Sequence, residues 1–157
     1  MNALTSFEKN TSLTPYGIAA LRWTLALYWG VHWCYKVLYQ GMPATEHLFV
    51  SLGYPAWFAW GDITLEVIAE IGLILGLYVR TLSQLLLVIL IPAMALWIPN
   101  GIWAIHGGYE FPLLWIFLQF ILALLGPGAM SIKTLPWLDA LARSDRFHNR
   151  NLTAVRP

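Results

Sequence analysis

Residues 16–39, YGIAALRWTLALYWGVHWCYKVLY, decide the fold class of this chain. The stretch is long enough for one membrane-crossing helix, since a span needs about 20 mostly apolar residues. Its basic side chains are confined to Arg22, His32 and Lys36. Because a charge in hydrocarbon is costly, each of them needs a partner or a function. The stretch therefore predicts a transmembrane helix with polar groups at defined depths.

The composition of the whole chain favours the same class. Of the 157 residues, 59% are hydrophobic and 11% are charged, and the mean hydropathy is +0.62. An average soluble domain carries roughly 25% charged residues, so the composition excludes a soluble monomer and a disordered chain. The net charge of +1 creates no field that would attract nucleic acid. The single cysteine, Cys34, excludes an internal disulfide.

Three further apolar stretches follow, at residues 55–78, 82–99 and 111–125, and Gly and Pro residues mark the connections between the spans. An even number of spans puts both termini on one side, together with eight of the nine Lys and Arg residues. The positive-inside rule assigns that side to the cytoplasm. We therefore expect an all-α integral membrane protein, a bundle of four transmembrane helices with both termini cytoplasmic. Pro92 is expected to kink the third helix.

Three segments follow from these spans. Residues 1–15 are expected to be a cytoplasmic N-terminal segment, residues 16–128 the four-helix domain, and residues 129–157 a basic cytoplasmic tail. The tail has two interpretations. It is either a solvated segment that fixes the topology, or it contains a short interfacial helix that begins near residues 136–138 and brings arginines to anionic headgroups.

Ionisable side chains on the first two spans are predicted to meet. His32 and Lys36 are four residues apart, as are Asp62 and Glu66, so each pair shares one helix face. A rise of about 1.5 Å per residue puts both pairs at similar depth. These four residues either form ion pairs that hold the two helices together or make up a functional site. In the second case, one lysine facing two acids leaves a carboxylate that holds or passes a proton.

Other polar and aromatic residues of the spans also have expected roles. Arg22 and Glu70 match in depth and are predicted to form a structural ion pair, and Gln119 is predicted to make an interhelical hydrogen bond. Tryptophan is concentrated in the outer half, which is typical of an interfacial belt or of an aromatic pocket open to the outside. The expected walls of that pocket are Trp29, Trp33 and Trp60, and its expected rim is His106, Tyr109 and Glu110.

Several segments together resemble the DoxX family of four-helix prokaryotic membrane proteins. They are Leu21-Arg22, Gly30-x-His32-x-x-x-Lys36, Phe49 with Gly53-x-Pro55, Glu66 with Gly76 and Arg80, Gly107-Gly108-Tyr109-Glu110-x-Pro112-Leu113-Leu114, and Leu125-Gly126-Pro127-Gly128-x-x-Ser131. The resemblance covers roughly residues 21–132. Glu70 and Cys34 stand where the family pattern has small or apolar residues.

The resemblance implies a bundle in the prokaryotic cytoplasmic (inner) membrane and a link to membrane redox chemistry. One branch of the family is a subunit of thiosulfate:quinone oxidoreductase, and other members resemble membrane anchors of complexes that handle oxidative stress or sulfur transfer. The expected partners are the lipid bilayer and a soluble or membrane redox protein, and no nucleic acid is expected. The resemblance is compatible with both a monomer and an oligomer.

The first functional hypothesis is a quinone-interacting oxidoreductase subunit with quinone as its cofactor. Glu66 would accept a proton, His32 would bond a quinone oxygen, and Lys36 would tune Glu66. The other quinone-contacting candidates are Trp29, Trp33, Trp60, Asp62, Tyr109 and Glu110. Because the sequence has no haem, flavin or iron–sulfur signature, electrons would come from a partner or directly from a small substrate.

Two alternatives remain. The second hypothesis is a non-catalytic anchor or assembly subunit whose basic tail recruits a soluble partner. The third is a small-molecule or metal transporter. Its potential ligands are His32, Cys34, His47, Glu66 and Glu110. Zinc and copper need three or four converging ligands, and these residues are scattered along the chain, so we predict no metal site.

Overall fold

The computed structural model describes residues 13–132, which fold into helices without any strand. The four long helices are α2 (Thr14–Cys34), α4 (Trp57–Leu75), α5 (Val79–Met94) and α6 (Glu110–Leu125). Each coincides with an expected apolar stretch, which confirms the all-α class. No helix in this part of the chain combines the length and the apolar character needed to cross a membrane. The tail helix expected near residues 136–138 lies outside the described residues.

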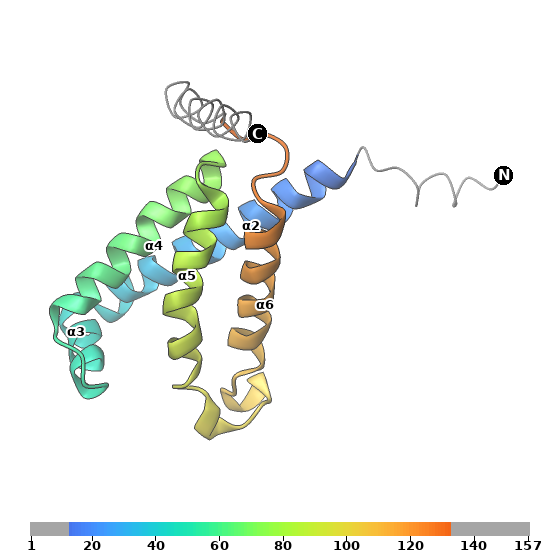
Figure 1. Cartoon of the computed structure of the whole chain (residues 1–157). Coiled ribbons are helices and arrows are strands. Elements are labelled where there is room, and N and C mark those ends of the chain that lie inside the picture. The colour runs from blue at the N-terminus through green and yellow to red at the C-terminus, as the bar shows by residue number, and fades with distance from the viewer. Residues whose placement is uncertain (1–12, 133–157) are drawn as a thin grey trace, which may run out of the picture.

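The helices run up and down, so that both ends of the described chain lie at one end of the bundle, beside the turn from α4 to α5 (Figure 1). Two backbone hydrogen bonds hold this end together. The amide of Ala129 donates to the carbonyl of Pro15 at 2.8 Å, and the amide of Ile132 donates to the carbonyl of Leu75 at 2.9 Å. Residues 129–132 are therefore packed onto the bundle rather than separate from it.

The connection between α2 and α4 is helical, which the sequence analysis did not predict. A π-helical turn, η2 (Tyr35–Gln40), continues α2 and is followed by a short helix, α3 (Met42–Ser51). Gly41 separates them with a φ of 86°, a conformation that favours glycine. Pro43 stands in the first turn of α3, where its missing N–H leaves no hydrogen bond unmade. The same two residues that indicated a loop therefore also permit a new helix.

Pro92 lies inside α5, in its last turn, as expected for a proline in the third span. The helix stops at Met94, whereas the apolar stretch continues to residue 99. Proline has no N–H to donate and disturbs the preceding turn, and the chain tightens here, with the amide of Ala95 donating to the carbonyl of Pro92 at 3.0 Å. Two 3₁₀ turns, η3 (Ile98–Asn100) and η4 (Ala104–His106), then lead to α6.

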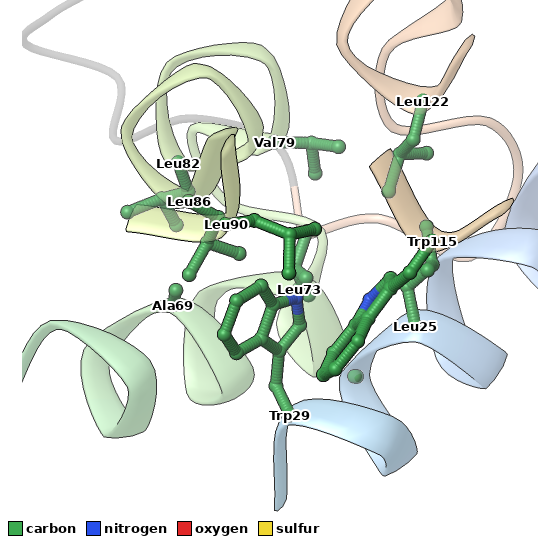
Figure 2. Packing of buried hydrophobic residues seen from close by; sticks show 11 residues of the cluster. Leu25, Trp29, Ala69, Leu73, Val79, Leu82, Leu86, Leu90, Trp115 and Leu122 are labelled. Carbon is green, nitrogen blue, oxygen red and sulfur yellow. The ribbon is translucent and has the colours of Figure 1, made fainter. Parts of the chain in front are cut away.

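The core lies where all four long helices meet (Figure 2). Helix α2 contributes Leu25, Ala26 and Trp29, and α6 contributes Trp115 and Leu122. The other labelled members of the cluster come from α4 and α5: Ala69, Leu73, Val79, Leu82, Leu86 and Leu90. The Trp29 and Trp115 rings lie 4.6 Å apart between their centroids. This contact joins α2 to α6 and forms one border of the candidate site.

Candidate functional site

Four ionisable side chains from α2, η2 and α4 form one cluster, which we call the charged cluster: His32, Lys36, Asp62 and Glu66. Lys36 Nζ donates to Asp62 Oδ2 at 2.5 Å and to Glu66 Oε1 at 2.9 Å. His32 Nδ1 lies 3.0 Å from the same Glu66 oxygen. The structure thus brings together the two pairs that depth alone had matched, because both helices present them at the same level of the α2–α4 contact.

Burial and unpaired atoms give the charged cluster its chemical character. The Glu66 side chain is fully buried and Lys36 is 15% exposed, while His32 is 39% exposed and connects the cluster to the outside. Glu66 Oε2 and Asp62 Oδ1 are buried and accept no hydrogen bond from residues 13–132. One lysine facing two carboxylates leaves one negative charge to balance. The neighbouring His32 imidazole balances this charge when it is protonated.

A threonine that the sequence analysis missed holds the backbone beside the charged cluster. The buried Thr45 of α3 donates its hydroxyl to the Lys36 carbonyl at 3.3 Å, and its oxygen is 3.2 Å from the Gly41 carbonyl. This contact fixes the π-helical turn from which Lys36 extends. No sequence signal indicated it, since α3 was read as a connection.

Two tryptophans stand against the histidine of the charged cluster. The ring centroid of His32 is 5.9 Å from that of Trp29 and 5.4 Å from that of Trp115, edge-on in both cases. The Trp29 indole donates to Gln119 Oε1 at 3.0 Å, so the predicted interhelical bond of Gln119 is present. Trp115 was missed as a wall residue, although its place in the outer half of the fourth span was a usable signal.

Trp33 and Trp60, expected as walls, have other partners. The indole of Trp33 donates to Glu70 Oε2 at 2.6 Å, and that of Trp60 donates to Glu46 Oε1 at 2.6 Å. Each helical residue is turned by about 100° from the preceding one, so Trp33 faces another side of α2 than His32. A matching depth along the helix was therefore not sufficient to predict that either tryptophan lies at the charged cluster.

The predicted ion pair of Arg22 with Glu70 is wrong. Arg22 Nη1 donates to the carbonyls of residues 73–74 at 2.6 and 3.1 Å, and Nη2 donates to those of residues 129–130 at 3.1 Å each. Carbonyls in the last turn of a helix lack intrahelical partners and attract cations. The guanidinium therefore caps α4, while Glu70 accepts from Trp33.

Two of the expected rim residues, His106 and Tyr109, precede α6, and the third, Glu110, is its first residue. Glu110 Oε2 accepts the amide of Ala104 at 3.1 Å, and the Tyr109 amide donates to the Gly101 carbonyl at 3.1 Å. His106 ends η4. Among residues 13–132, no polar contact links these residues to the charged cluster, and no three His, Cys, Asp or Glu side chains converge as a metal site would require.

Replacing Trp29 with phenylalanine is expected to lower the free energy of unfolding by about 1–2 kcal/mol, because buried Gln119 loses its partner. Unfolding of purified protein by sodium dodecyl sulfate in mixed micelles measures this. A second replacement, Gln119→Leu, should recover part of the loss, since two apolar partners leave no buried polar atom unpaired. No recovery in the double variant would contradict this interpretation.

The comparisons with known proteins identify one family. The family model described as DoxX matches residues 17–107, which is more than half of the chain. The matched residues include the whole charged cluster, and the expected closing motif at residues 125–131 lies beyond them. No curated protein and no solved structure matches the chain.

Proposed function

The chain belongs to the DoxX family of membrane-associated proteins, and on this basis we propose that it is a quinone-interacting subunit of a membrane redox system. Its redox partner would act in sulfur or oxidative-stress metabolism. Electrons pass between the quinone and that partner protein, while residues of this chain bind the quinone and move its protons.

The proposal includes the location and topology of the protein, which would be a four-helix bundle in the prokaryotic inner membrane with both termini cytoplasmic. Large apolar side chains are exposed on the outside of every long helix, among them Leu27, Ile68, Val88 and Leu124, each more than half exposed. Contiguous apolar surface of this kind needs a nonaqueous neighbour, and acyl chains provide one. Arg22 and Arg80 lie at the end of the bundle where residues 129–130 pack, and the positive-inside rule favours the cytoplasmic side for that end.

The observation that carries the proposal is that, within residues 13–132, the Glu66 carboxylate has hydrogen-bond partners at one of its two oxygens and none at the other. One oxygen contacts Lys36 and His32, and the other is buried without a hydrogen-bond donor. Reduction of a quinone takes up two electrons and two protons, and oxidation of a quinol releases them. Glu66 exchanges these protons one at a time, and His32 connects it to the outside. The buried Trp29 and Trp115 rings stand edge-on to His32 and hold its imidazole beside Glu66.

Replacing Glu66 with glutamine is expected to weaken binding of a quinol about tenfold, because a hydroxyl bonds a carboxylate roughly twice as strongly as a neutral acceptor. Binding of the oxidised quinone should change less, since its carbonyl groups cannot donate a hydrogen bond to Glu66. Titration of protein in lipid nanodiscs with decylubiquinol and with decylubiquinone measures both affinities.

Glu46→Gln is the matched control, because within residues 13–132 the hydrogen-bond partner of Glu46 is the exposed residue Trp60. Extraction of purified wild-type protein and of both variants, followed by mass spectrometry, adds the amount of native quinone bound. Equal quinol affinity in wild type and Glu66→Gln would contradict the proposal.

A membrane anchor or assembly subunit is the second candidate function. The direct contact of Lys36 with both carboxylates favours it, because paired charges can lock α2 to α4 without any reaction. In that case Glu66→Gln changes stability alone, and the purified protein carries a partner protein but no quinone.

A further inference from the structure

A shallow groove lies along α2 and the π-helical turn η2, beside Glu70 of α4. Its volume is about 560 Å³, and it is open to the outside along its length, since lining side chains such as Leu38 are more than half exposed. Leu27, Val31 and Leu38 line it with aliphatic side chains, and Cys34 lies among them. The lining residues extend from Leu27 to Tyr39, which is about 18 Å along a helix. The groove therefore has the shape and the apolar character that suit a chain-like ligand.

One carboxylate, from Glu70 of α4, enters this apolar groove. Its Oε2 accepts the Trp33 indole at 2.6 Å. Its Oε1 lies against Gly30, where a Cβ would overlap with that oxygen. Within residues 13–132 no donor bonds Oε1, and no basic side chain lies within ion-pair distance of Glu70. The missing side chain at residue 30 thus makes room for the Glu70 carboxylate, which lines the groove.

These features select a narrow class of ligand. The carboxylate repels fatty acids and anionic lipids, and the apolar walls disfavour a strongly hydrated cation. A ligand with a neutral head group and an apolar chain suits both features, because the head group donates a hydrogen bond to the carboxylate and the chain packs against the apolar walls. The stacked rings of Tyr35 and Tyr39, with centroids 5.2 Å apart, add an aromatic surface at one end of the groove.

We propose that this groove is a second quinol site, where a hydroxyl of the quinol bonds Glu70 Oε1 and the isoprenoid chain lies along Leu27, Val31 and Leu38. This inference rests on the proposed function, which supplies a ligand of this chemistry. Glu70 follows Glu66 by one turn of α4, so the groove and the charged cluster lie at adjacent levels. The groove holds the quinol from the lipid beside the cluster at which its protons are exchanged.

Cys34 provides a direct probe, because it is the single cysteine of the chain and lines the groove. The full chain is reconstituted in phosphatidylcholine vesicles without oxygen, and alkylation of Cys34 by N-ethylmaleimide is timed with and without decylubiquinol. We expect saturating quinol to slow alkylation at least fivefold. Glu70→Gln should raise the quinol concentration needed for half protection about tenfold, whereas Glu46→Gln should leave it unchanged.

The outcomes separate this inference from the proposed function. Protection of Cys34 should persist in Glu66→Gln, because that residue does not line the groove. Absence of protection in the wild type, or unchanged protection in Glu70→Gln, overturns the second site, whatever the Glu66 variant does to total quinol binding. Equal protection by dodecanol, which has the hydroxyl and the chain but no ring, also overturns it, because the groove would then be a general site for hydroxyl lipids.

Discussion

Replacing Lys36 with methionine is expected to lower the free energy of unfolding by about 3–5 kcal/mol. Methionine keeps much of the apolar stem but removes the ammonium that bonds both Asp62 and Glu66. Two buried carboxylates then face each other, and His32, which contacts Glu66, is the one basic group of the cluster that is left. Sodium dodecyl sulfate titration in mixed micelles, followed by far-ultraviolet circular dichroism, measures the loss.

A double-mutant cycle tests whether charge is the cause. Adding Asp62→Asn to Lys36→Met removes one of the two facing charges, and we expect it to restore at least 1 kcal/mol. Asp62→Asn by itself should destabilise, because Lys36 then loses one counter-charge. Additive losses in the double variant would mean that the lysine stabilises the protein by packing rather than by pairing.

Replacing Arg22 with alanine is expected to cost about 4 kcal/mol of unfolding free energy and to release residues 129–132 from the bundle. The fully buried guanidinium makes four hydrogen bonds to backbone carbonyls from two segments, residues 73–74 and 129–130. A hydrogen bond to a charged group contributes about 1.5–3 kcal/mol, and such losses are only partly additive. The same titration gives the energy, and limited proteolysis after residue 126 reports release of the segment.

Arg80→Ala is the matched control for this prediction. Arg80 is an exposed arginine at the start of α5 that lies beside Gly126 but donates no hydrogen bond to residues 129–132, and surface substitutions usually change stability by less than about 0.5 kcal/mol. Equal losses in the two variants, or an unchanged proteolysis pattern in Arg22→Ala, would show that Arg22 does not join the two segments.

Depth along a helix was predictable from the sequence, whereas direction around the helix was not. A constant rise per residue was sufficient to match His32 and Lys36 with Asp62 and Glu66. The same reasoning paired Arg22 with Glu70 and was wrong, since it considered side chains alone. The backbone carbonyls at the end of α4 are acceptors that no sequence pattern displays.

The sequence by itself determined the all-α class, the position of the four long helices and the family, because apolar runs and their Gly and Pro boundaries are local properties. Only the tertiary structure decided which residues share a site. Trp115 reaches His32 and Thr45 reaches the Lys36 backbone, because helix crossing and the π-helical turn set which way each side of α2 faces. The groove beside Glu70 depends on the same rotation, since it forms where the bare backbone of Gly30 meets α4.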